Sequence, residues 1–179
     1  TPGGAALDGL ARTDRGALIA ILALLVAGLG VKAALVPLHG WLPVAMIAPA
    51  PVSALLHAVA VVKAGVFGIV RVVHDVYGVE VARGLGVLPW LVGLATFTIL
   101  YGSVRALVQD DLKRRLAFST VSQLSYIVLG TALGSRLALT GAVVHLVHQG
   151  VMKITLFLCA GNLAETLGVV FGVDEKRVQ

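Results

Sequence analysis

The sequence has little charge for its length, and this scarcity indicates the class of protein. Only 13% of its 179 residues are charged and 58% are hydrophobic, whereas about a quarter of the residues in a soluble domain are charged. A membrane-spanning helix needs about 20 mostly apolar residues, and five stretches meet this requirement. We therefore predict an all-α polytopic transmembrane helix bundle of about five spans, an integral membrane protein with no separate soluble domain.

Other absences narrow the possibilities further. Cys159 is the only cysteine, so it cannot form an internal disulfide, and it offers no metal-binding spacing. The opening segment lacks a basic region leading into a short apolar core, so no signal peptide is predicted. Because the first residue is Thr1, we expect a central fragment of a longer protein. The net charge of +5 does not indicate a nucleic-acid partner, because three of the five lysines lie inside apolar segments.

Proline is concentrated in one apolar segment, which predicts a broken helix. Four prolines, including Pro37 and Pro43, fall within fifteen residues, and each removes a backbone donor and clashes with the preceding turn. We expect a short second half over residues 41–47, packed in protein or lining a cavity. The predicted spans of a single transmembrane domain, residues 1–179, are 16–36 (broken, continuing to about 49), 52–73, 85–108, 112–133 and 136–170. The segment VHDVYGVEVARG is expected to form a loop after the second span.

Ionisable side chains inside the spans point to transport, because such groups usually mark ion or proton pathways. None of the nine arginines lies deep in a span, whereas three lysines do. Arginine keeps its charge, but a buried lysine can release its proton, and histidine titrates near neutrality. The candidate proton-pathway residues are Lys32, His57, Lys63, His145, His148 and Lys153.

Spacing within the last span places part of this set on one helical face. His145, Gln149 and Lys153 are separated by four positions, so they form a stripe in which each step rises by about 6 Å. His148 lies about 60° around the helix from His145 and is expected on the same polar face. The alternative is structural: each histidine forms only a hydrogen bond between helices, and the lysines pair with carboxylates that hold the bundle together.

Four segments carry a family resemblance that covers most of the chain. The sequence resembles the antiporter-like subunits of respiratory complex I, of Mrp-type sodium/proton antiporters and of related membrane-bound hydrogenases, with the D-subunit branch of the Mrp type looking nearest. The matching stretches are VKAALVPLHGWLPVAMIAPAPVSALLHA, VVKAGVFGIVR, QDDLKRRLAFSTVSQLSYIVLG and HLVHQGVMKITLFLCAGN. The resemblance implies a bundle with a hydrated axis of ionisable residues along the membrane midplane.

The resemblance also implies roles for individual residues. Lys32 matches the lysine of the first broken helix, Lys153 the central connecting lysine, and His145 the histidine two turns before it. His57 matches a relay histidine and Lys63 a lysine present in some branches. Two departures affect the relay. The family usually has a histidine at the position of Gln149 and a small polar residue at that of His148. Its glutamate partner for Lys32 and its exit residue lie on helices outside this sequence.

The predicted function is proton or sodium/proton translocation through a midplane relay. The expected setting is a multisubunit complex in a prokaryotic cell membrane, with other membrane subunits and lipid as partners. The protein is expected to perform no bond chemistry and to bind no cofactor or metal itself, although the complex could be an NADH:quinone oxidoreductase-like or hydrogenase enzyme. Two alternatives are a passive membrane anchor with structural ion pairs and a redox protein holding haem between His57 and His145.

Overall fold

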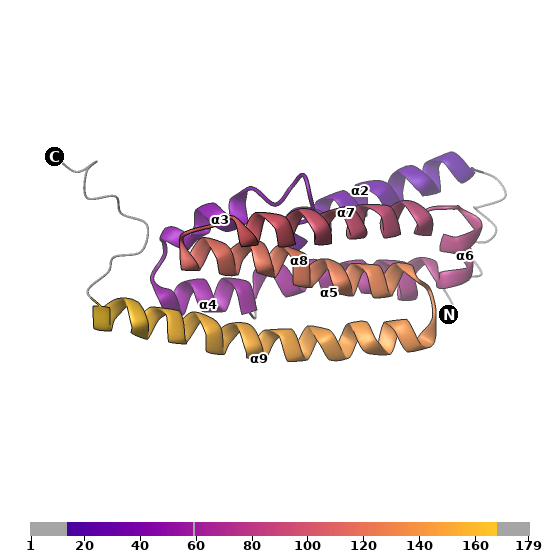
Figure 1. Ribbon diagram of the computed structural model, residues 1–179. Coiled ribbons are helices and arrows are strands. Elements are labelled where there is room, and N and C mark those ends of the chain that lie inside the picture. The colour runs from indigo at the N-terminus through magenta and orange to yellow at the C-terminus, as the bar shows by residue number, and fades with distance from the viewer. Residues whose placement is uncertain (1–13, 59, 168–179) are drawn as a thin grey trace.

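The computed structural model describes residues 14–58 and 60–167, apart from the side chains at positions 50, 57, 58 and 167, and every regular element in this part of the chain is a helix. The elements are α2 (Arg15–Ala33), α3 (Trp41–Val44), the 3-10 helix η1 (Ala45–Ile47), α4 (Ala50–Ala58), α5 (Val61–Arg71), the π-helix η2 (Val72–Tyr77), α6 (Val79–Gly84), α7 (Leu88–Leu107), α8 (Leu112–Ala132) and α9 (Arg136–Leu167). The long helices lie side by side, with α8 between α2 and α9 (Figure 1). The predicted helix bundle is confirmed.

The first span is broken where the prolines predicted. Asp14 caps α2 by accepting a hydrogen bond from the backbone N–H of Ala17 at 3.2 Å, and α2 ends at Ala33. Ala34 then adopts a left-handed conformation with φ of 56°. The chain turns through Pro37 and becomes helical again in α3 and η1, which together occupy the residues expected for the second half. The indole N–H of Trp41 donates to the carbonyl of Val31 at 2.7 Å and so joins the two halves.

The second span differs from the expected single helix. It consists of α4 and α5, which meet around residue 60, followed by η2. The prediction of a loop over VHDVYGVEVARG after this span is wrong, because the segment is helical and forms η2 and α6. It contains no proline, and Gly78, with φ of 79°, lies between the two helices. An ion pair of 2.5 Å between Arg71 and Asp75 spans the junction of α5 and η2. The hydroxyl of Tyr77 donates to the carbonyl of Leu18 at 3.1 Å, which holds η2 against α2.

The most buried long helix, α8, forms the centre of the bundle, packing against α7, α9 and α5. Three of its buried hydroxyls are satisfied within the helix: those of Thr120, Ser125 and Thr131 donate to carbonyls four residues earlier in α8. Within the described residues, four helical segments are long and apolar enough to cross a membrane, namely residues 15–33, 51–77, 88–107 and 136–166. The expected span 112–133 coincides with α8, which is long enough but too polar to be among these four segments.

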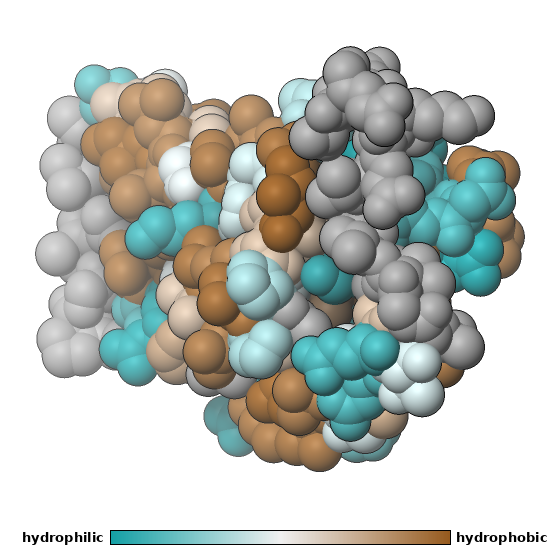
Figure 2. All heavy atoms as spheres, turned by 90° about the vertical axis from the view of Figure 1, so that its left-hand side faces the viewer, coloured by the Kyte–Doolittle hydropathy of each residue, from teal (hydrophilic) through white to brown (hydrophobic). Residues whose placement is uncertain are grey.

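The outer surface of the bundle is strongly apolar. Leu24 on α2, Trp90 on α7 and Leu137 on α9 are 73%, 81% and 85% exposed. Figure 2 looks onto the end of the bundle near α3 and the last turns of α9, where hydrophilic side chains alternate with hydrophobic ones. Large apolar side chains exposed on several helices are typical of a surface that faces lipid or further membrane helices.

Candidate functional site

Lys153 is the most deeply buried cation among the described residues. It lies in the middle of α9 with only 1% of its surface exposed. Its ammonium nitrogen Nζ donates to Oγ of Ser119 at 2.5 Å and to the carbonyl of Leu116 at 3.2 Å, both on α8. The ion pairs seen in the described part of the chain do not include it. A buried amine held by neutral oxygens, without a carboxylate, can exist in either protonation state.

Gln149 lies one turn before Lys153 and is completely buried. Neither its amide nitrogen nor its amide oxygen has a hydrogen-bond partner among the described residues. An unsatisfied buried polar group costs about 1–3 kcal/mol, and most buried polar side chains in proteins are paired with protein groups or ordered water. The amide of Gln149 is therefore a buried group whose donors and acceptor are free of partners among the described residues.

His145 continues the stripe one turn further along α9. Its side chain is half-buried, and Nε2 is buried without a partner in the described part of the chain. The ring meets that of Tyr126 on α8 edge-on, with a centroid separation of 6.2 Å. It also lines a crevice of about 440 Å³ between α8 and α9. The structure thus brings His145, Gln149 and Lys153 onto the inner face of α9, as their spacing predicted.

The other candidates are not gathered at this face. His148 and Lys32 are exposed, so the described residues do not bury His148 together with the stripe. Lys63 is half-buried on α5. His57 lies in α4, and its side chain falls outside the described residues. Hydrogen bonds between any two candidates are absent from the described part of the chain. Lys32 occupies the last turn of α2, where that helix packs closely against Gly65 of α5.

Two ionisable residues, one half-buried and one buried, were missed by the sequence reasoning. His39, in the proline-rich break, packs edge-on against Tyr101 with centroids 4.9 Å apart, and its buried Nδ1 has no partner among the described residues. Lys113, at the start of α8, is 8% exposed and donates to the carbonyl of Ala48 at 3.2 Å. The signal for His39 was a lone histidine in an uncharged segment. Lys113 belongs to a basic turn that is typical of a solvated helix end.

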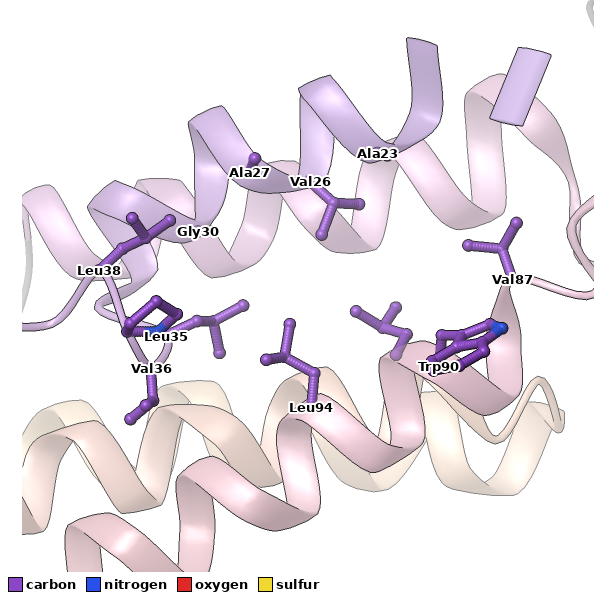
Figure 3. A pocket seen from close by; sticks show the side chains of 12 residues that line it. Ala23, Val26, Ala27, Gly30, Leu35, Val36, Leu38, Val87, Trp90 and Leu94 are labelled. Atoms are coloured by element: carbon purple, nitrogen blue, oxygen red, sulfur yellow. The ribbon is translucent and has the colours of Figure 1, made fainter. Parts of the chain in front are cut away.

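A second cavity, of about 330 Å³, lies between α2 and α7 and contains no ionisable side chain (Figure 3). Its walls are hydrocarbon, from residues such as Val26 and Leu94, with Trp90 at one end. Ion transfer needs groups that solvate or carry charge, so this cavity is not the candidate site. Among the described residues there is also no cluster of three or more His, Cys, Asp or Glu side chains suited to a metal ion.

The fold and site define a helical integral membrane protein with a buried lysine–glutamine–histidine stripe. Comparison with known proteins identifies the family within this class. The family described as "NADH:quinone oxidoreductase/Mrp antiporter, TM" matches residues 6–170, and the chain belongs to it. The solved structure of the Mrp complex from Dietzia sp. contains a similar chain, with a TM-score of 0.74 and 33% identity, covering 81% of this chain and 26% of that one.

Curated relatives come from both branches of the family. The chain is 43% identical to NADH-quinone oxidoreductase subunit N of Desulforudis audaxviator over 159 residues, or 87% of this chain and 31% of that protein. It is 45% identical to a probable K⁺/H⁺ antiporter protein of Rhizobium meliloti over 149 residues, or 83% of this chain and 14% of that protein. The NAD(P)H-quinone oxidoreductase chain 5 of Synechocystis shares 39% identity over 179 residues, 98% and 25% of the respective chains. The chain thus spans about a third or less of these relatives.

Proposed function

We propose that this chain carries the central part of a proton path, or of a sodium/proton exchange path, through one member of a multisubunit membrane complex. The observation that carries the proposal is the environment of Lys153, a buried amine in the middle of α9 whose two observed partners are a hydroxyl and a carbonyl. Family membership supports the same interpretation, since relatives named as antiporter and quinone oxidoreductase proteins share the segment. The complex is proposed to lie in a prokaryotic cell membrane.

The amine of Lys153 is suited to pass a proton on. An ammonium group has three N–H donors, and two of these are used by Ser119 and Leu116. The third remains for a passing water molecule or for the next group along α9. Loss of a proton leaves a neutral amine that keeps contact with Ser119, because a hydroxyl can donate as well as accept. Lys153 can therefore change charge without rearranging α8 and α9.

The remaining candidates form the outer part of the proposed path. Lys32 and His148 are exposed in this chain, and relatives are several times longer, so we place further membrane helices of the full protein, or lipid, beside them. Lys63 is half-buried on α5, and α5 packs on both α2 and α8. Lys63 is thereby proposed as a step between Lys32 and Lys153. His57 is proposed as a relay group on α4, which packs against α9.

The test uses the full-length protein within its complex, reconstituted into vesicles. We expect Lys153→Ala and Lys32→Ala each to lower proton uptake by about 100-fold, the lower part of the range for a positioned proton-transfer group, with assembly retained. Arg114→Ala is the control, because Arg114 is an exposed cation at the start of α8 outside the candidate set. Wild-type uptake in both lysine variants would leave the passive anchor as the better account.

A further inference from the structure

The crevice between α8 and α9 is open to the surroundings at one side and ends at ionisable groups. Towards the turn between the two helices it is lined by Leu133, just after α8, and by Ala138, in the first turn of α9. Its polar lining consists of Gln123 and Tyr126 on α8 and His145 on α9. The volume of about 440 Å³ holds several water molecules, because each occupies about 30 Å³ in the liquid. The crevice therefore leads from one end of the bundle to the first member of the buried stripe.

Beyond the crevice the stripe continues through a residue that cannot carry a proton itself. The Gln149 amide does not titrate, but it offers two donors and an acceptor, none of them used by the described residues. His145 Nε2 is likewise buried and unpaired in the described part of the chain. A water molecule is stable in a buried site when it finds two to four polar partners. His145, Gln149 and Lys153, at successive turns of one helix face, supply such partners.

We propose that the crevice between α8 and α9 is a water inlet and that Gln149 holds water between His145 and Lys153. This inference rests on the proposed function and adds to it a route and a role for Gln149. Because His145 and Lys153 start about 12 Å apart along α9, more than one water molecule is needed between them. An imidazolium at His145 gives its proton to the nearest of these waters, the proton passes along the chain, and the last water gives one of its own protons to the neutral amine of Lys153. Water and amide end unchanged, so Gln149 positions the water and takes no proton.

The first test asks what fills the crevice. Gly141 on α9 lines it, and a Cβ at this position would meet nothing within 4 Å. Gly93 on α7 offers the same open space but lies outside the crevice. Each glycine lies five positions after the first residue of its helix, Arg136 or Leu88, and these two helix ends lie at the same end of the bundle (Figure 1). Gly141 and Gly93 therefore lie at a similar distance from the same end of the bundle.

In a Cys159→Ser background, Gly141→Cys and Gly93→Cys are labelled in the full-length, assembled protein in membranes. A thiol must ionise to react, so the charged reagent trimethylammonium-ethyl methanethiosulfonate should modify Gly141→Cys at least about tenfold faster than Gly93→Cys. A neutral, lipid-soluble maleimide should reach both. Protection of Gly141→Cys from the charged reagent, with labelling by the neutral one, would mean that lipid or another helix fills the crevice, and the inference would be wrong.

The second test asks whether Gln149 acts through hydrogen bonds. Gln149→Leu keeps a similar volume and should slow proton uptake per assembled complex by about tenfold, the loss expected from one hydrogen bond at a transfer step. Gln149→His should retain uptake, because imidazole also donates and accepts. Thr155→Val is the matched control, since Thr155 is an exposed α9 residue whose hydroxyl donates to the carbonyl of Val151. A purely structural role for Gln149 would lower assembly and leave the rate per complex unchanged.

The two proposals fail in different ways. If Lys153→Ala loses uptake in the same preparation while Gln149→Leu keeps it, the water-holding role is wrong and the proposed function stands. If both variants keep uptake, the proposed function fails as well. A high-resolution map of the intact complex gives a readout independent of transport: density for water within hydrogen-bond distance of the Gln149 amide is expected, and an amide bonded only to protein groups would overturn the inference.

Discussion

Two lysines that the sequence ranks alike, Lys153 and Lys32, lie in opposite surroundings. Lys153 is enclosed by α8 and α9, with partners supplied by this chain. Lys32 is exposed at the end of α2, although its backbone is tightly packed against Gly65. At the first site the described residues bury the lysine and supply two hydrogen-bond partners. At the second they hold only the backbone, and the side chain is exposed. A buried charge in a membrane protein is thus defined as much by its neighbouring helices as by its own helix.

The largest expected effect tests whether Lys153 must release its proton or need only carry a positive charge. Lys153→Arg keeps the charge, but a guanidinium does not release its proton, so proton uptake should fall by about 100-fold. Lys32→Arg should assemble normally, because the exposed side chain has room for the larger group. Uptake is measured with a pH-sensitive dye in vesicles and normalised to assembled complex. Wild-type transport by Lys153→Arg would show that the site needs only a cation.

The next effect concerns how α2 is held beside Lys32. A Cβ on Gly65 would overlap the backbone nitrogen of Ala33 and would come within 2.7 Å of the carbonyl carbon of Lys32. Gly65→Ala should therefore lower the free energy of unfolding by about 1–3 kcal/mol, as overpacking does. Gly93→Ala is the control, because its Cβ would meet nothing within 4 Å. Thermal unfolding in detergent measures both, and equal midpoints would contradict the close approach of α2 and α5.

The sequence predicted what depends on local chemistry and helical repeat. Proline spacing predicted the second half-helix of the first span, and four-residue spacing placed Gln149 and Lys153 on one buried face. Helix formation over the expected loop at η2 was missed, because the contacts that hold it, such as Tyr77 to Leu18, come from α2.

Partners across helices were also beyond the reach of the sequence. Ser119 is one of several hydroxyl residues on α8, and only the packing of α8 against α9 selects it as the partner of Lys153. The exposure of a side chain also depends on the neighbouring helices. Lys32 and Lys153 both lie in apolar runs, and hydropathy does not reveal which side of a helix its neighbours cover. Element positions and shared faces were therefore predictable, whereas contacts between helices were not.

A smaller effect is expected when the partner of Lys153 is removed. Ser119→Ala deletes the hydroxyl that accepts from Nζ at 2.5 Å, which should slow proton uptake by about tenfold, the factor for one hydrogen bond to a charged group. Ser122→Ala is the matched control on α8, because Ser122 shares a hydrogen bond of 2.9 Å with Ser103 and not with Lys153. Equal uptake in the two serine variants would mean that the carbonyl of Leu116 alone positions the amine.

The smallest expected effect lies at the broken helix, on the side of Lys32. Trp41→Phe keeps an aromatic ring but removes the indole N–H that donates to the carbonyl of Val31. That carbonyl lies in the last turn of α2 and also accepts a hydrogen bond from the backbone N–H of Ala34 at 3.2 Å. Losing one of its two hydrogen bonds should lower the free energy of unfolding by about 1 kcal/mol. The midpoint of thermal unfolding in detergent measures the change. Because the bond joins the two half-helices directly beside Lys32, the loss should also loosen this lysine more than Lys153, which hydrogen exchange of the α2 and α9 backbones can compare. Faster exchange confined to α9 would contradict the view that the Lys32 region is held by its backbone and the Lys153 region by its side chains.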